Sequence, residues 1–510
     1  PFLLAGVTGS GKTEVYLRLV QQTIARGGQA LILVPEIALT PQLEGRVAGR
    51  FPAARVVSLH SALAEGARSQ GFVQAMEGRA DIVLGTRLSV FTPLPRLGLI
   101  VVDEEHDASY KQHEGVRYNA RDLAIWRARQ RGVPIVLGSA TPSLESWHSA
   151  DTGRYRRVEL ASRAVAATLP KVRPVDIRRE KLQNGVSEHL LRAIAARLER
   201  GEQSLVFLNR RGYAPLTLCR TCGYRFQCPN CSAWLVEHRL SRRLACHHCG
   251  HEIPTPEACP ECSEPDCLVA CGPGVERIAD EVAAILPEAR VALVTSDTLT
   301  SPAKAAEFVE MASAKAIDVI VGTQLVTKGY HFPELTLVGV IDADMGLEGG
   351  DLRAAERTYQ QVAQVAGRAG RGEKPGEVLI QTRHPEAAVI EALASGDRDA
   401  FYAAEAEARR DAGAPPFGRW AAIIVSSEDE AEARDAARGI GGSAPRLDDV
   451  LILGPAPAPL SLLRGRYRYR LLINARRSTE LQRVIREWLE PLRFPPGVRV
   501  AVDIDPYSFV

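Results

Sequence analysis

The sequence predicts an α/β protein with two lobes built on parallel sheets, a cysteine-rich module inserted in the second lobe, and a small α/β domain at the carboxyl end. Three observations carry this prediction. Short apolar runs alternate with helix-length stretches, which is typical of a parallel sheet with helices on both faces. All ten cysteines lie between Cys219 and Cys271, in the middle of the second alternating region. With 510 residues the chain exceeds a single core, and about three domains are expected.

The composition is that of an ordinary soluble protein. Hydrophobic residues make up 45% and charged residues 24% of the chain, and no apolar run is long enough to span a bilayer, which excludes a disordered or membrane-embedded protein. The 63 basic and 61 acidic residues give a net charge of only +2, so a nucleic-acid site must come from local clustering of charge. The sequence begins at Pro1 without a methionine or a secretory leader, so we expect further residues upstream. The confinement of the cysteines to one segment favours a reduced cytosolic metal site, so we expect a cytoplasmic protein.

Residues 1–160 are expected to form the first lobe, and its first apolar run leads into a phosphate-binding loop. The run FLLA is followed by GVTGSGKT, which has P-loop spacing, and then by the helix-like segment KTEVYLRLVQQTIA. Glycines allow backbone N–H groups to approach phosphate oxygens, and a helix N-terminus favours negative charge. Lys12 is expected to bridge the outer phosphates and Thr13 to bind magnesium. The predicted ATP-binding residues are Gly6, Thr8, Gly9, Ser10, Gly11, Lys12 and Thr13.

A later strand of the same lobe, LGLIVVDEEH, ends in carboxylates. Carboxylates at the end of a buried strand need a cation, because an unpaired buried charge is costly. After a P-loop, Asp103 is placed to hold Mg²⁺ through water, and Glu104 is placed to orient or deprotonate the attacking water.

The second lobe is expected in two pieces, residues 161–218 and 272–398. Its alternating pattern begins near QSLVFL, stops at the cysteines, and resumes with ARVALVTSDT, AIDVIVGTQ and LTLVGVIDAD. The cysteine region, residues 219–271, is therefore an insertion within a domain.

Eight of the ten cysteines form four C-x-x-C pairs, which predict two structural zinc sites. Eight thiolates complete two tetrahedral Cys₄ sites and leave no open position for a catalytic water. An iron–sulfur cluster is the chemical alternative. The four pairs combine into two sites in three ways, and their spacing does not choose among them. Cys267 and Cys271 are expected to be spare thiols, and His247, His248 and His251 to form a polar surface. The predicted ligands are Cys219, Cys222, Cys228, Cys231, Cys246, Cys249, Cys259 and Cys262.

Several segments together carry a family resemblance. GVTGSGKT, VPEIALTPQ, GTRLSVF, DEEH and GSATPS, in that order, resemble the first motor lobe of superfamily 2 helicases. DEEHDASYKQHEGVRYNARDLA, RGRYRYRLLI and VDIDP are similar to the primosomal family of replication-restart helicases. The resemblance implies two RecA-like lobes and an ATP- and Mg²⁺-dependent DNA helicase with 3′-to-5′ polarity, which binds stalled or forked DNA and initiates primosome assembly. That family carries an amino-terminal DNA-binding region, which this sequence lacks before its first motor strand.

The resemblance also implies roles for single residues. In QVAGRAGR, Arg368 and Arg371 are expected to reach the γ-phosphate, and in GTQLVTKGYHFP, Lys328 to link DNA contact to hydrolysis. The zinc pairs are expected to be nested, with the outermost two around one zinc and the inner two around the other. The segment after the acidic motif is expected to be an aromatic-rich loop that contacts nucleic acid through Tyr110, Lys111, Arg117 and Tyr118, because rings stack on bases and cations neutralise phosphates.

Residues 399–510 are expected to form the carboxyl-terminal domain, which binds DNA or a partner. Within it, RGRYRYR alternates with period two, which predicts four arginines on one face of a strand and two tyrosines on the other. Arg466 and Arg468 on the basic face are candidates to bind single-stranded DNA or an acidic partner; a merely solvated face is the alternative.

Two other functions compete with a DNA helicase. One is a primosome scaffold with weak or dispensable hydrolysis, which would have no need for Lys12, Asp103, Glu104 and Arg371 together; the other is an RNA helicase. The resemblance implies primosome proteins and single-strand-binding protein as partners, and a bacterial, nucleoid-associated monomer without membrane contact.

Overall fold

The computed structural model divides into two compact units, of residues 1–209, 279–344 and 355–403, and of residues 210–278, 345–354 and 404–510. The first unit holds the predicted first motor lobe and most of the predicted second one. The second holds the cysteine-rich module together with the carboxyl-terminal domain, which the sequence had suggested as separate parts. The structure describes residues 1–508 except 36–39, 62, 164–168, 184, 209–215, 220, 223, 239–242, 247–248, 266, 272–274, 296–297, 300–301, 324–331, 333, 348–352 and 373.

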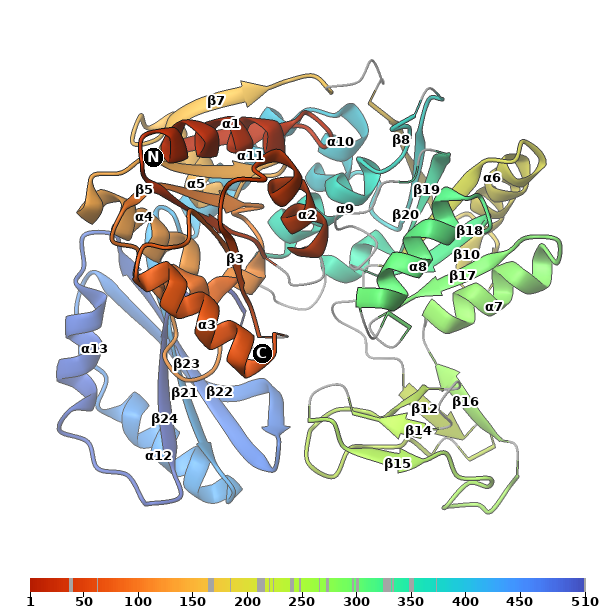
Figure 1. The fold of residues 1–510 in the computed structure, drawn as a ribbon. Helices are drawn as coiled ribbons and strands as arrows, with labels where there is room; N and C mark the ends of the chain where they lie inside the picture. The colour runs from red at the N-terminus through yellow and green to blue at the C-terminus, as the bar shows by residue number, and fades with distance from the viewer. Residues whose placement is uncertain are drawn as a thin grey trace. The chain divides into compact units, whose positions relative to one another are not determined.

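The first lobe is a seven-stranded parallel sheet in the order β3-β4-β2-β5-β6-β1-β7 (Figure 1). Its central strands are buried along their whole length, as the continuous apolar runs predict for a sheet covered on both faces. The strands are β1 (Phe2–Gly6), β2 (Gln29–Leu33), β3 (Val56–Leu59), β4 (Ile82–Gly85), β5 (Leu97–Asp103), β6 (Ile135–Ser139) and β7 (Arg156–Leu160). The helices are α1 (Lys12–Ala25), α2 (Thr40–Arg50), α3 (Glu65–Met76), η2 (Arg87–Phe91), η3 (Ala108–Tyr110), α4 (Ala120–Arg131) and α5 (Leu144–Asp151).

The second lobe is a six-stranded parallel sheet in the order β17-β18-β11-β19-β20-β8. Two of its strands, β8 and β11, precede the cysteines and the other four follow them, so the module is inserted within this lobe as expected. The strands are β8 (Lys171–Asp176), β11 (Gln203–Leu208), β17 (Val291–Val294), β18 (Val319–Gly322), β19 (Leu335–Ile341) and β20 (Glu377–Thr382), with a hairpin of β9 (Leu182–Gln183) and β10 (Val186–Ser187). The helices are α6 (Glu188–Glu199), α7 (Val275–Ile285), α8 (Pro302–Ser313), η5 (Ala343–Gly346), α9 (Ala354–Ala366), α10 (Ala388–Ser395) and α11 (Arg398–Asp411).

The second unit contains only antiparallel sheets among its described residues. The cysteine-rich module has two small ones, β12-β16 and β13-β14-β15, formed by β12 (Leu216–Cys219), β13 (Val236–His238), β14 (Arg243–Ala245), β15 (Glu252–Pro254) and β16 (Leu268–Cys271). The carboxyl-terminal domain is a four-stranded sheet in the order β22-β23-β21-β24 with two helices. Its elements are β21 (Gly418–Ser427), α12 (Glu430–Gly442), β22 (Val450–Leu463), β23 (Arg466–Arg476), α13 (Leu481–Leu489) and β24 (Arg499–Ile504). Across the described residues of both units, every helix is too short or too polar to cross a membrane.

Candidate functional site: a nucleotide site between two motor motifs and two Cys₄ centres

The predicted P-loop joins β1 to α1 and has the shape that phosphate binding requires. Gly9 and Gly11 adopt positive φ values of 83° and 90°, which only glycine tolerates without strain, and α1 begins at Lys12 directly after them. The Lys12 ammonium donates to the Gly6 carbonyl over 2.9 Å. The Ser10 hydroxyl is buried and has no hydrogen-bond partner among the described residues. A phosphate group would supply that missing acceptor at the positive end of α1.

Asp103 is the last residue of β5, the strand that pairs with β2 and β6 in the sheet. The Tyr16 hydroxyl of α1 donates to its Oδ1 over 3.0 Å. Burial, followed by the negative charge of Glu104, raises the pKa of Asp103 to about 6, although Lys12 and the Tyr16 hydroxyl oppose the rise. A cation bound near Asp103 would favour its charged form, and the role of Asp103 in holding Mg²⁺ stays a prediction.

Glu104 is contacted by the second lobe. Its backbone has a φ of 45°, unusual for a residue with a side chain, and its carboxylate accepts a hydrogen bond from the Gln364 amide of α9 over 3.2 Å. The Gln364 Nε2 also lies 2.9 Å from His106 Nε2, and His106 Nδ1 lies 2.7 Å from the Ser139 hydroxyl. The sequence prediction missed Gln364 and His106 as site residues, although Gln364 begins the segment that carries the two predicted arginines.

That arginine-bearing segment lies against the P-loop. A Cβ placed on Gly367 would approach Thr8 Oγ1 to 2.6 Å, so the two loops are in direct contact. The Arg371 side chain donates to the Gly367 carbonyl over 3.0 Å. Burial, followed by the positive charge of Arg163, lowers the pKa of Arg371 to about 10, and Glu104 opposes this. Arg368 is also buried, with 7% of its surface exposed.

The first half of the predicted aromatic-rich loop is in the interior, which differs from the expected surface position. Tyr110 and Lys111 are 1% and 2% exposed, and the Tyr110 hydroxyl donates to the carbonyls of Leu33 and Asp103 over 3.0 and 2.7 Å. The reason is that the loop folds back on itself, with Lys111 bridged to Asn119 in antiparallel fashion. Tyr110 thus holds the loop to the ends of β2 and β5, and neither Tyr110 nor Lys111 offers a surface to a nucleic acid here.

The second half of the loop does reach the surface. Arg117 and Tyr118 are partly exposed, and Val116 between the two halves is 81% exposed. The Tyr118 ring packs edge-on against Phe91, with centroids 4.9 Å apart. Arg117 and Tyr118 therefore remain candidates for contact with nucleic acid. Lys328, the other predicted coupling residue of the motor, lies outside the described residues.

The eight paired cysteines gather into two groups, in the nested arrangement that the family resemblance implied. Within each group all four Sγ atoms lie within 4.8 Å of one another, and facing pairs are 3.5–3.7 Å apart. A tetrahedral zinc with Zn–S bonds of about 2.3 Å holds its sulfurs about 3.8 Å apart, so both groups fit zinc. The groups are Cys219, Cys222, Cys259 and Cys262, called here site 1, and Cys228, Cys231, Cys246 and Cys249, called site 2.

Cys267, expected to be a spare thiol, is buried beside site 1. It packs in one cluster with the ligands Cys219 and Cys259, and its thiol donates to the Glu264 carbonyl over 2.9 Å. It therefore fills the interior around the site. The Cys271 side chain lies outside the described residues.

The basic strand of the carboxyl-terminal domain differs from the open face that its alternation predicted. Arg464 lies in the turn before β23, so it does not share a face with the other arginines. Arg466 is engaged by the carbonyls of Ser426 and Gly497 and by the Glu428 carboxylate, 3.2 Å away, and Arg468 is only 9% exposed. The packing face is confirmed in part, since Tyr469 lies against the core of the domain.

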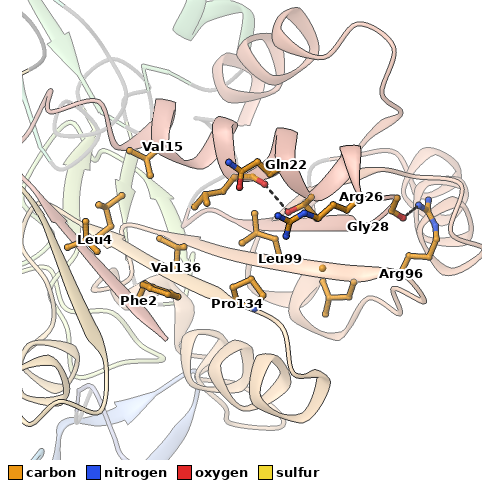
Figure 2. A pocket seen from close by; sticks show the side chains of 16 residues that line it. Phe2, Leu4, Val15, Gln22, Arg26, Gly28, Arg96, Leu99, Pro134 and Val136 are labelled. Carbon is orange, nitrogen blue, oxygen red and sulfur yellow. Dashed lines mark hydrogen bonds between the residues drawn. The ribbon is translucent and has the colours of Figure 1, made fainter.

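A separate apolar cavity of about 660 Å³ lies beside the carboxyl-terminal half of α1 (Figure 2). No residue of the P-loop lines it, so it is distinct from the nucleotide site. Figure 2 shows side chains from β1, α1 and β5 around it, with Arg96 at one end donating to the Gly27 carbonyl. Its lining includes Phe2, Leu4, Val15, Leu19, Leu99 and Val136.

Comparison with known families agrees with this arrangement. Three family models match: "DEAD/DEAH box helicase" over residues 2–149, "PriA DNA helicase Cys-rich region (CRR) domain" over residues 228–254, and "Primosomal protein N C-terminal domain" over residues 410–507. Among solved structures, RecG bound to a three-way DNA junction aligns with a TM-score of 0.45 and 18% identity, over 80% of this chain and 43% of that one.

Curated relatives match over the whole chain. The replication restart protein PriA of Bacillus subtilis is 40% identical over 100% of this chain and 64% of its own length, and that of Haemophilus influenzae is 39% identical over 99% and 69%. The PriA of Rickettsia conorii is 44% identical over 511 residues, which are 100% of this chain and 78% of that protein. The chain, with its P-loop lobe, second motor lobe and two Cys₄ centres, belongs to the family of replication restart proteins PriA.

Proposed function

We propose that this chain is an ATP-dependent DNA motor that moves with 3′-to-5′ polarity and opens stalled or forked DNA for primosome assembly. The hydrolytic part of the proposal is supported by residue geometry. Membership of the PriA family supports the other parts of the proposal, which are made on that basis. These parts are DNA as the nucleic acid along which the chain moves, the 3′-to-5′ polarity, and the primosome partners.

One observation carries the proposal most directly, namely the hydrogen bond from Gln364 to Glu104. Glu104 follows Asp103, which interacts electrostatically with Lys12, and Gln364 lies in the last turn of α9, just before Arg368 and Arg371. A shift of α9 relative to the P-loop lobe would therefore change the surroundings of the residue proposed to orient the attacking water. In this way, a contact with nucleic acid that moves the lobes changes the rate of ATP hydrolysis, and hydrolysis in turn changes the affinity for nucleic acid.

The residues that meet nucleic acid are proposed to be Arg117 and Tyr118, which lie in the loop that Tyr110 ties to the carbonyl of Asp103. Ring stacking and phosphate neutralisation are both available at that surface. Because the loop is anchored at the acidic motif, a contact there is transmitted to the hydrolytic residues over a short path.

The first test is steady-state ATP hydrolysis with no nucleic acid, with forked DNA and with an RNA of the same length. We expect stimulation by DNA, none in a Lys12→Ala variant, and little stimulation by RNA. Equal and negligible rates with and without DNA would favour a scaffold, and stronger stimulation by RNA would favour an RNA helicase. Unwinding of partial duplexes with 3′ or 5′ tails then tests the polarity.

The link between the lobes is tested by Gln364→Ala. Loss of this contact should reduce DNA-stimulated kcat on the order of 10–100-fold, because small misplacements of catalytic groups have effects of that size. Gln361→Ala is the matched control, since it removes the same amide from the same helix and Gln361 has no described contact with Glu104 or His106. Equal rates for the two variants would contradict the proposed coupling.

A further inference from the structure

The hairpin formed by β22 and β23 ends on the cysteine-rich module, more than 200 residues earlier in the chain but in the same compact unit. The two strands are joined by a two-residue turn, Arg464–Gly465, with φ values of 51° and 72°. Turns with positive φ at both central positions keep hairpin strands paired through their natural twist. The turn is therefore a rigid tip, and its backbone groups point in fixed directions.

The tip makes a strand-like set of hydrogen bonds to the segment that follows Cys228. The Ser232 N–H donates to the Leu462 carbonyl over 2.8 Å, and the Leu462 N–H donates to the Ser232 hydroxyl over 2.6 Å. The Ser232 hydroxyl also lies 2.8 Å from that of Ser461, and the Gly465 N–H donates to the Asn230 carbonyl over 2.8 Å. These four contacts, from three hairpin residues, fix the register of the tip on this segment.

One further contact reaches a zinc ligand itself. The Arg464 N–H donates to the Sγ of Cys231 over 3.3 Å. Other backbone donors to ligand sulfurs are close to them in sequence, such as Cys222 N–H to Cys219 at 3.5 Å and Asn230 N–H to Cys228 at 3.4 Å. Among these, site 2 alone receives a donor from the carboxyl-terminal domain.

Apolar packing reinforces the contact. Leu460 and Leu463 of the hairpin lie against the cluster that surrounds site 2, which contains the ligands Cys228, Cys231 and Cys246. Zinc-bound thiolates keep much of their negative charge, and N–H donors and apolar cover around them stabilise the metal and exclude water.

We propose that the β22–β23 hairpin tip is a structural part of site 2, with Arg464 and Ser232 as positioning residues. Zinc in site 2 and docking of the hairpin then stabilise one another, so the metal couples the carboxyl-terminal domain to the cysteine-rich module. Site 1 has no such partner among the described residues. The proposal rests on zinc filling the two Cys₄ groups and is independent of the direction of movement or the nucleic acid preferred.

The test compares the zinc-loaded full chain with a Ser232→Ala/Leu463→Ala variant. Both are treated with a zinc chelator and N-ethylmaleimide, and the alkylation of each cysteine is followed by mass spectrometry, which reports the two sites separately without any activity assay. Hydrogen exchange of residues 460–466 reports docking of the hairpin. Leu453→Ala is the matched control, because it shortens a leucine on the same strand that is 48% exposed and is not part of the cluster.

We expect alkylation of the site 2 cysteines to become about tenfold faster in the double variant, with site 1 and the control unchanged, since second-layer contacts of metal sites commonly change affinity by this factor or more. Conversely, zinc removal from the unmodified chain should speed exchange in residues 460–466. Unchanged alkylation at site 2 would overturn the proposal, and so would equal acceleration at both sites, which would indicate a general loss of stability.

Discussion

At the scale of single residues, burial makes the charged form of Asp103 in the acidic motif unfavourable, and a bound cation would stabilise that charged form. The pKa of Asp103 is raised from 3.8 to about 6, chiefly by burial, so the folded nucleotide-free protein binds a proton there more tightly than the unfolded chain does. Above pH 6 the carboxylate is charged in both states, and its desolvation costs stability. As the pH falls through 6 towards 3.8 this cost disappears.

Asp103→Asn should therefore stabilise the nucleotide-free protein at pH 8, by about 1–3 kcal/mol from the size of the pKa shift, while abolishing hydrolysis. The Tyr16 hydroxyl can still donate to the amide oxygen, so its hydrogen bond is kept. The gain should shrink between pH 7 and pH 5, as measured by thermal unfolding without magnesium. Asp151→Asn, at a carboxylate that is 48% exposed in the same lobe, serves as control and should change little. A gain that did not depend on pH would contradict this account.

At the scale of elements, one buried carboxylate joins the end of β5 to α4 and α5. The Glu105 side chain is fully buried and pairs with Arg121 over 3.1 Å, so Arg121 is part of the interior. Glu105 also accepts from the Ser143 N–H, the Ser143 hydroxyl and the Ser146 hydroxyl over 2.6, 3.0 and 2.8 Å. These bonds fix the start of α4, directly after the loop that carries Tyr118.

Arg121→Met should weaken this part of the lobe by about 3–5 kcal/mol, because it leaves a buried carboxylate without its cation. A Glu105→Gln/Arg121→Met double variant should recover most of the loss, since the amide needs no counter-charge. Hydrogen exchange of the α4 amides measures both effects, and Arg129→Met, on an exposed part of α4, controls for the loss of a cation. If the single and double variants exchanged equally fast, the ion pair would not be what holds α4.

At the scale of the whole molecule, the sequence predicts most reliably those motifs whose chemistry requires a fixed spacing of residues. The P-loop, the strand that ends at Asp103, the insertion within the second lobe and the C-x-x-C pairs follow from local patterns, and the structure places them accordingly. Contacts between segments that are distant in the sequence do not follow from local patterns. The burial of Tyr110 depends on the carbonyl of Leu33, the role of Gln364 depends on Glu104, and the contact of Arg464 depends on Cys231. The alternation of arginines and tyrosines along β23 predicts that the two residue types lie on opposite faces of the strand. It carries no information on which other segments cover each face.

The division into two units leads to a last prediction, on zinc removal. In the described clusters around the two Cys₄ sites, five of the ten buried residues are ligands, and the large buried side chains beside them are Phe226, Leu235 and Leu244. In contrast, the core cluster of the first lobe consists of thirteen buried residues, twelve aliphatic ones and Tyr16, without a cysteine. Structural zinc contributes on the order of 10 kcal/mol to folding of such modules, more than this small apolar interior can replace.

Chelation under reducing conditions should therefore remove hydrogen-exchange protection from β12–β16 while β1, β5 and β6 keep theirs, and re-addition of zinc should restore it. Basal ATP hydrolysis without DNA should persist in the zinc-free protein, because Lys12, Asp103 and Gln364 all belong to the other unit. Loss of protection in β5 in parallel with β12–β16 would show that the two units fold as one. Full protection of β12–β16 without zinc would show that apolar packing alone holds the module.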